Sequence, residues 1–152
     1  MRREGVNHMM KRKVFAAAFT IMTVLIGFSF LLALYDRSGY STFSLSFFFL
    51  SLWIVPVIII YGLPVSLLTE KLTKKLSKYW RITTTFLIHL SFGALFIFIY
   101  GVLFENNINI FHEFHEFWEV YEGLFIPSLI SAGVFWVYDE VIRHILYIQQ
   151  TN

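Results

Sequence analysis

Apolar residues fall in four long runs along the chain, separated by short polar segments. The runs cover about residues 14–35, 45–68, 82–104 and 121–146. A helix needs about 20 apolar residues, at 1.5 Å of rise each, to cross roughly 30 Å of hydrocarbon. The pattern therefore predicts an all-α polytopic membrane protein, with four transmembrane helices in an up-and-down bundle that forms a single domain, 1–152.

The fourth run is the shortest of the four. Its uncharged part, residues 123–138 between Glu122 and Asp139, spans only about 24 Å as a helix. Two explanations stay open. The membrane thins here, or Glu122 or the Asp139–Glu140 pair lies at headgroup level while the helix continues to Ile148.

Composition agrees with a membrane location. Hydrophobic residues make up 57% of the chain and charged residues 14%, against roughly 25% charged in an average soluble domain. The basic residues before the first run resemble a signal peptide, but the run exceeds the usual 7 to about 15 residues and no A-x-A site closes it. We therefore expect an uncleaved anchor. The absence of cysteine excludes disulfides, thiolate metal ligands and a cysteine nucleophile.

The basic residues predict the orientation. Eleven of the twelve Lys and Arg residues lie in the N-terminal segment, in residues 69–81 or in the C-terminal segment, and only Arg37 lies on the other side. The positive-inside rule then places both termini in the cytoplasm and the chain in the cell membrane. Anionic lipid headgroups suit four lysines at helical spacing after the second run. These are Lys71, Lys74, Lys75 and Lys78. This distribution explains the positive charge without a nucleic-acid partner.

The segment before the fourth run carries candidate chemistry. At helical spacing His112, His115, Glu116 and Glu119 share one face and aromatic residues the other, which predicts an outer amphipathic helix over about 109–121 that lies on the membrane surface. Solvated charges are the simpler interpretation. The alternative is a cation or proton-sensing site with His112, His115 and Glu116 as metal ligands, because two imidazoles and a carboxylate on one face can bind Zn²⁺.

Three polar residues are expected inside or at the edge of the membrane. His89 lies about 12 Å into the third run, where it either hydrogen-bonds a Ser, Thr or Tyr of another helix, such as Tyr61, or serves a function. Asp139 and Glu140 precede Arg143 by four and three residues and can pair with it. They form either an interfacial salt bridge that ends the span or a charged cytoplasmic mouth.

Prolines and small residues predict how the helices pack. Pro56 interrupts the second run and the segment 61–64 breaks it again. Small side chains form close-packing stripes on the first and fourth runs. They are Ala16, Thr20, Thr23 and Gly27 on the first and Ser128, Ser131 and Ala132 on the fourth.

Two segments, 61–68 followed by the basic loop and 135–140, resemble small four-span membrane proteins of uncharacterised function from Bacillus-type Gram-positive bacteria. The resemblance implies a plasma-membrane protein and supplies no catalytic residues. Since no nucleophile stands with a base, we expect a non-enzymatic accessory or self-associating protein without a cofactor, whose partners are the lipid bilayer and a second copy or another membrane protein. The alternative is a small oligomeric transporter or channel for a cation or small solute, lined by His89, Asp139 and Glu140. A membrane enzyme with a metal at His112, His115 and Glu116 is a weaker third possibility.

Overall fold

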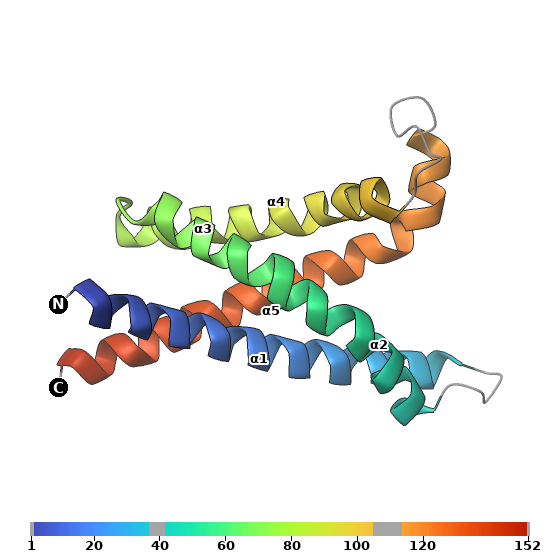
Figure 1. Cartoon of the computed structure of the whole chain (residues 1–152), viewed down its shortest axis with the longest axis horizontal. Helices are drawn as coiled ribbons and strands as arrows, with labels where there is room; N and C mark the ends of the chain where they lie inside the picture. Colours follow the sequence, from blue (N-terminus) through green and yellow to red (C-terminus); the bar gives the residue numbers. More distant parts are fainter. Residues whose placement is uncertain (1, 37–41, 105–113, 152) are drawn as a thin grey trace.

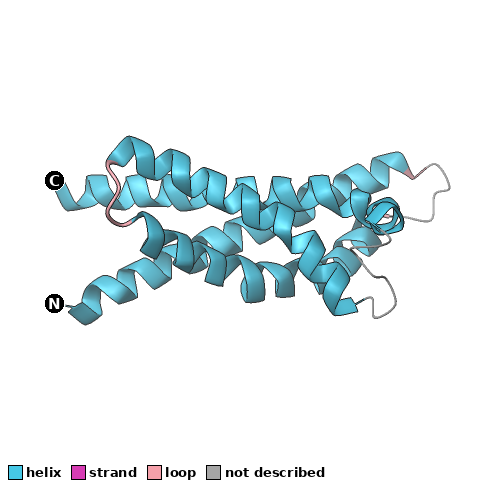
Figure 2. Ribbon diagram, turned by 90° about the horizontal axis from the view of Figure 1, so that it is seen from above, coloured by secondary structure: helices cyan, strands magenta, loops and turns pink. Residues whose placement is uncertain are grey.

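The computed structural model describes residues 2–36, 42–104 and 114–151, and in these ranges every element is a helix (Figures 1 and 2). Four of the helical segments are long and apolar enough to cross a membrane. They are Met9–Tyr35, Phe43–Thr73, Lys78–Val102 and Tyr121–Leu146. The predicted all-α, four-span fold is therefore confirmed.

The helices extend beyond the apolar runs into the flanking charged residues. The elements are α1 (Arg2–Tyr35), α2 (Phe43–Val57), the π-helical turn η1 (Ile58–Gly62), α3 (Leu63–Thr73), α4 (Lys78–Phe104) and α5 (Phe114–Thr151). The second span thus consists of α2, η1 and α3 in direct succession.

A π-helical turn joins the two halves of the second span shortly after Pro56. Proline supplies no N–H to the carbonyl one turn earlier, and two residues later the Ile58 N–H is shared between the carbonyls of Ile54 and Val55. The helical path continues through the turn, and Pro64 falls in the first turn of α3, where its missing N–H is tolerated. The predicted break at 61–64 is therefore wrong.

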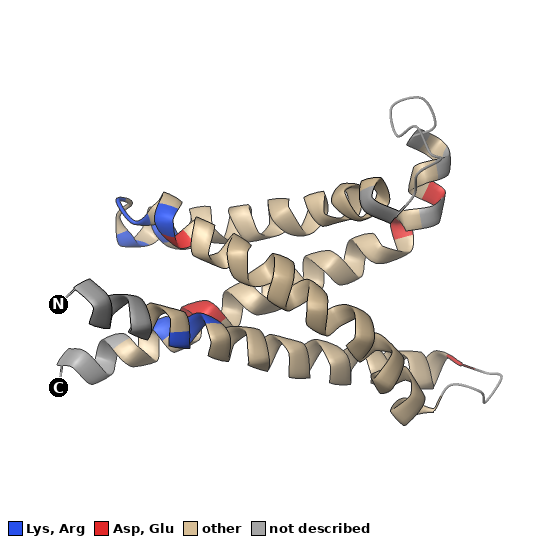
Figure 3. Cartoon of the chain, viewed as in Figure 1, with Lys and Arg blue, Asp and Glu red and all other residues tan. Residues whose placement is uncertain are grey.

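The helices exchange partners along the bundle. At the end that carries both termini, α5 lies beside α1 and α3 lies beside α4 (Figure 1). Toward the opposite end, α2 stays with α1, and the beginning of α5 stays with α4. We name the first end the basic end, because Lys and Arg gather there among the described residues (Figure 3). At the basic end α3 also contacts α1, whereas toward the other end the α1–α2 pair and the α4–α5 pair separate (Figure 1).

Most of the predicted close-packing residues lie at helix contacts. Ala16 and Thr20 are fully buried on α1, and Gly93 of α4 meets α5 so closely that an added Cβ would lie 2.8 Å from the Cβ of Ala132. Gly27 is the exception, because a Cβ there would meet nothing within 4 Å. The close-packing role predicted for Gly27 is therefore wrong.

The beginning of α5 differs from the predicted surface helix. Residues 114–121 are the first turns of the helix that becomes the fourth span, and they pack on α4. Phe117 is fully buried, and its ring covers Gly101, where any added Cβ would overlap it. Phe117, which was not singled out from the sequence, thus fixes this segment against the bundle. The part of the predicted helix before Phe114 lies outside the described residues.

The basic connection between the second and third spans is a tight turn, so the predicted helical stripe of lysines is wrong. The α3 helix ends at Thr73, whose carbonyl accepts a hydrogen bond from the N–H of Leu76 at 3.0 Å, and α4 begins at Lys78. The four lysines are exposed around this turn rather than on one helix.

Candidate intramembrane site

Six charged side chains from three helices meet near the basic end. They are Arg12 and Lys13 of α1, Glu70 of α3, and Asp139, Glu140 and Arg143 of α5. With three cations and three anions, this charged cluster has no net charge. The side chains of Lys13 and Asp139 are 1% and 4% exposed, so the centre of the cluster is removed from water.

Asp139 is the centre of the charged cluster. Its Oδ2 accepts from Lys13 Nζ at 2.6 Å and lies 3.3 Å from Arg143 Nη2, while its Oδ1 accepts from Arg12 Nε at 3.1 Å. One carboxylate therefore binds cations from two helices. Ionised groups at low dielectric are tolerated only with such close partners.

Glu70 brings the third helix into the cluster. Its Oε2 accepts hydrogen bonds from the Arg12 guanidinium and from Arg143 Nη2, the latter at 2.8 Å. The same oxygen lies 3.2 Å from Lys13 Nζ. Arg143 also donates to Glu140 Oε2 at 2.7 Å. Through these contacts the cluster fastens α1, α3 and α5 to one another at the basic end.

The predicted pairing of Asp139 and Glu140 with Arg143 is confirmed, but its setting differs from both expectations. Asp139 is buried and α5 continues past it, because α1 and α3 supply matching charges, so the pair neither ends the span nor forms an open mouth. Arg12, Lys13 and Glu70 were not predicted as site residues. Their positions in the sequence could have indicated them, because Arg12 and Lys13 directly precede the first apolar run and Glu70 closely follows the second.

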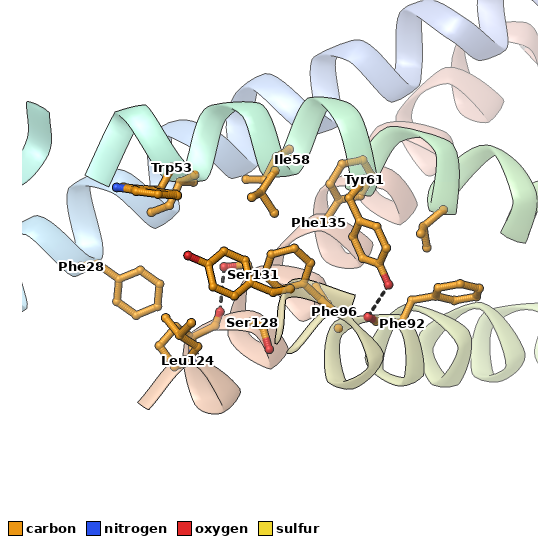
Figure 4. A pocket seen from close by; sticks show the side chains of 18 of the residues that line it. Phe28, Trp53, Ile58, Tyr61, Phe92, Phe96, Leu124, Ser128, Ser131 and Phe135 are labelled. Carbon is orange, nitrogen blue, oxygen red and sulfur yellow. Dashed lines mark hydrogen bonds between the residues drawn. The ribbon is translucent and has the colours of Figure 1, made fainter. Parts of the chain in front are cut away.

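A cavity of about 570 Å³ lies between the two separated helix pairs (Figure 4). Its wall is mainly apolar and combines residues of α1, α2, η1, α3, α4 and α5. Representative members are Phe28, Trp53, Ile58, Phe96, Leu124 and Phe135. Trp53 and Leu124 on this wall are exposed, and both belong to the apolar spans, so the cavity opens sideways at the level of these spans.

The hydroxyl groups on the cavity wall donate to main-chain carbonyls. Tyr61 of η1 donates to the Phe92 carbonyl of α4 at 2.7 Å, as Figure 4 shows. Ser131 and Ser128 donate within α5, at 2.8 and 2.9 Å, to carbonyls one turn earlier. Their hydrogens are engaged, and their oxygen lone pairs remain as acceptors.

His89 occupies the end of the cavity nearest the charged cluster. It is 4% exposed and stacks on Phe135, one helical turn before Asp139, with ring centroids 5.9 Å apart. Its Nδ1 lies 2.8 Å from the Thr85 carbonyl, and since a carbonyl only accepts, Nδ1 carries the hydrogen. In the neutral ring Nε2 is then an acceptor, and this buried atom has no hydrogen-bond partner among the described residues.

The predicted hydrogen bond between His89 and Tyr61 is wrong. Tyr61 instead donates to the Phe92 carbonyl in the next turn of α4, so it still joins two helices. His89 instead binds its own helix.

The predicted metal ligands lie mostly outside the described residues. His112 and the side chain of Glu116 belong to this undescribed part. His115 is exposed on the first turns of α5, with its Nδ1 3.2 Å from Oε1 of Glu119. Among the described side chains no group of three His, Asp or Glu is arranged to hold a metal ion. The metal site stays a prediction.

The fold and the hydropathy of its helices define an all-α, multi-pass membrane protein. Compared with protein-family models, curated proteins and solved structures, the chain matches none of them. The residues of the charged cluster and the cavity therefore carry the functional argument.

Proposed function

We propose that this chain is a non-enzymatic protein of the plasma membrane that binds an apolar molecule from the bilayer in its sideways-opening cavity. The cavity is the observation that carries the proposal. Its volume of about 570 Å³ falls in the range of roughly 300–1,000 Å³ typical of small-molecule sites. It opens where lipid surrounds the spans, and the charged cluster bounds it toward the basic end.

The distribution of charge supports an orientation with the basic end and both termini in the cytoplasm. Eleven of the twelve Lys and Arg residues belong to segments at this end, as the positive-inside rule requires of cytoplasmic segments. The four lysines around the α3–α4 connection are exposed there and suit anionic headgroups. The cavity then opens into the outer half of the bilayer.

The hydrogen bonding of the cavity supports binding rather than catalysis. An activated serine needs a base within hydrogen-bond reach of its hydroxyl. Ser128 and Ser131 donate to carbonyls of their own helix instead, and His89 gives its Nδ1 hydrogen to Thr85. A bound molecule would thus meet positioned but unreactive groups.

The charged cluster favours ligand binding over cation conduction. A cation path needs carboxylates that are free to exchange partners with the ion. Asp139, Glu140 and Glu70 are each bound to at least one guanidinium or ammonium of the same cluster. We therefore assign the cluster a structural role, and the cavity the function, whether the chain acts alone, as a homo-oligomer or as an accessory subunit.

Filling the cavity tests this function. The full chain is purified in mild detergent, and native mass spectrometry measures bound lipid-sized adducts, which are then extracted and identified. Ser131→Phe places a ring in the cavity, and Ser91→Phe is the matched control because Ser91 lies on an exposed face of α4 away from it. We expect an apolar adduct on the wild type and on Ser91→Phe, and its loss from Ser131→Phe. Equal occupancy in all three proteins, or no adduct on the wild type, would refute the function.

A further inference from the structure

We infer that the molecule bound in the cavity is a neutral lipid alcohol, a long apolar chain whose hydroxyl donates a hydrogen bond to Nε2 of His89. The inference rests on the proposed function and adds to it the polar group of the ligand and its depth in the membrane. Three observations carry it: the unpartnered nitrogen, the acceptor character of the wall and the lack of charge.

The first observation is the unpartnered nitrogen of His89. The imidazole is fixed on both sides, by the Nδ1 hydrogen bond to Thr85 and by the stack on Phe135. A buried acceptor without a partner costs roughly 1–3 kcal/mol. His89 lines the cavity, but Nε2 itself is covered by neighbouring protein atoms, so these atoms must shift to admit the ligand. A ligand that donates a hydrogen bond here recovers that loss, whereas a pure hydrocarbon does not.

The wall around His89 presents further acceptors. The oxygens of Tyr61, Ser128 and Ser131 have engaged their hydrogens with carbonyls. The indole nitrogen of Trp53 points away from Ile58 and Phe135 (Figure 4), and Tyr100 lies about 16 Å farther along α4 than His89 at 1.5 Å of rise per residue. The ligand group near His89 must therefore be a donor.

The third observation is the absence of charge on the described wall. None of the residues that line the cavity is Lys, Arg, Asp or Glu, and the nearby charged cluster is internally neutralised. A phosphate or carboxylate would lie beside acceptors, with no cation to neutralise it. An ammonium would have no counter-ion. Each of these charged groups would thus lose its water without gaining a partner. A hydroxyl donates its hydrogen without a net charge. This choice excludes ordinary phospholipids as ligands.

The shape of the cavity fixes the orientation of the ligand. His89 lies at the end where it stacks on Phe135. Figure 4 shows Trp53 and Leu124 at the opposite side of the cavity from Phe135. The hydroxyl therefore sits deep in the bilayer and the chain extends outward from it. Only a weakly polar head tolerates that depth, which again favours an alcohol.

The test is a titration of the full-length protein by native mass spectrometry with four probes of one chain length: stearyl alcohol, its methyl ether, stearylamine and stearic acid. The ether keeps the oxygen but cannot donate. We expect the wild type to bind the alcohol about tenfold more tightly than the ether, equivalent to about 1.4 kcal/mol. His89→Phe should abolish this preference. His89→Gln should retain part of it because the amide oxygen accepts a hydrogen bond.

The outcomes separate this inference from the proposed function. Equal binding of alcohol and ether to the wild type, with both lost in Ser131→Phe, would leave the function standing and refute recognition of a hydroxyl. Tighter binding of the amine or the acid would overturn the neutral class. If every probe binds the wild type and Ser131→Phe alike, both proposals fail.

Discussion

Replacing Asp139 by Asn removes the central charge of the cluster without changing the size of the side chain. Asp139 binds Lys13, Arg12 and Arg143, and its side chain is only 4% exposed. The substitution takes the cluster from neutral to a net charge of +1. It also sets an amide N–H₂ group among donors. Water is too distant to compensate for either change.

The expected cost follows from this burial. Leaving one partner of a buried ion pair uncompensated costs about 3–5 kcal/mol, or roughly 6–20 °C in midpoint temperature at about 2–4 °C per kcal/mol for a chain of this size. Glu140→Gln is the matched control. The side chain of Glu140 is 22% exposed and, among the side chains that the structure describes, binds only Arg143, which keeps two other carboxylates. Its replacement should cost at most about 1 kcal/mol.

The assay is thermal unfolding in mild detergent followed by tryptophan fluorescence, repeated by titration with sodium dodecyl sulfate. A third protein, Lys13→Met with Asp139→Leu, removes one charge of each sign and restores neutrality. It should recover most of the stability that either single replacement loses, because an apolar pair replaces a buried ion pair at little cost.

Two results would refute this reasoning. One is an equal loss of stability in Asp139→Asn and Glu140→Gln, which would show that burial does not decide the cost. The other is a double variant whose loss equals the sum of its two single replacements, since charge balance would then have no role.

Two further predictions concern helix packing. Gly93→Leu forces α4 away from Ala132 and should cost about 1–3 kcal/mol in the same unfolding assay. Gly27→Leu is the control and should change the midpoint little, because the space around Gly27 is open. Similar losses at both positions would contradict the observed contact. Tyr61→Phe removes the hydrogen bond to the Phe92 carbonyl and should cost about 0.6 kcal/mol. No measurable loss would show that this bond does not hold the second span against α4.

The spans could be predicted from the sequence because membrane insertion depends on local hydropathy. The fourth span agrees closely with its predicted range of 121–146, although its uncharged part is short. The charged residues at its end belong to the span because partners on other helices neutralise them. Local sequence shows that Asp139 and Glu140 can reach Arg143, but it contains no distance to Lys13, more than a hundred residues away. Half of the charged cluster was missed for this reason.

The cavity could not be predicted because it is bounded by residues from six elements and depends on where the helices cross. Single-sequence patterns showed that His89 is buried and that Pro56 perturbs its helix. They could not show that the Thr85 carbonyl of the same helix engages Nδ1, nor that Nε2 is thereby left without a partner. The chemistry of this site depends on which nitrogen is occupied, and that information is purely three-dimensional.

The charged cluster and the cavity are two consequences of one arrangement. Because the second span passes from α1 to α4 and α5 passes from α4 to α1, the helices change neighbours along the bundle (Figure 1). At the basic end this brings α1, α3 and α5 close enough for their charges to neutralise one another. At the other end the same crossing leaves the two helix pairs apart, with mainly apolar side chains facing the gap. The ion pairs at the basic end thus hold the helices together. The opposite end can therefore keep an open cavity even in a chain this small.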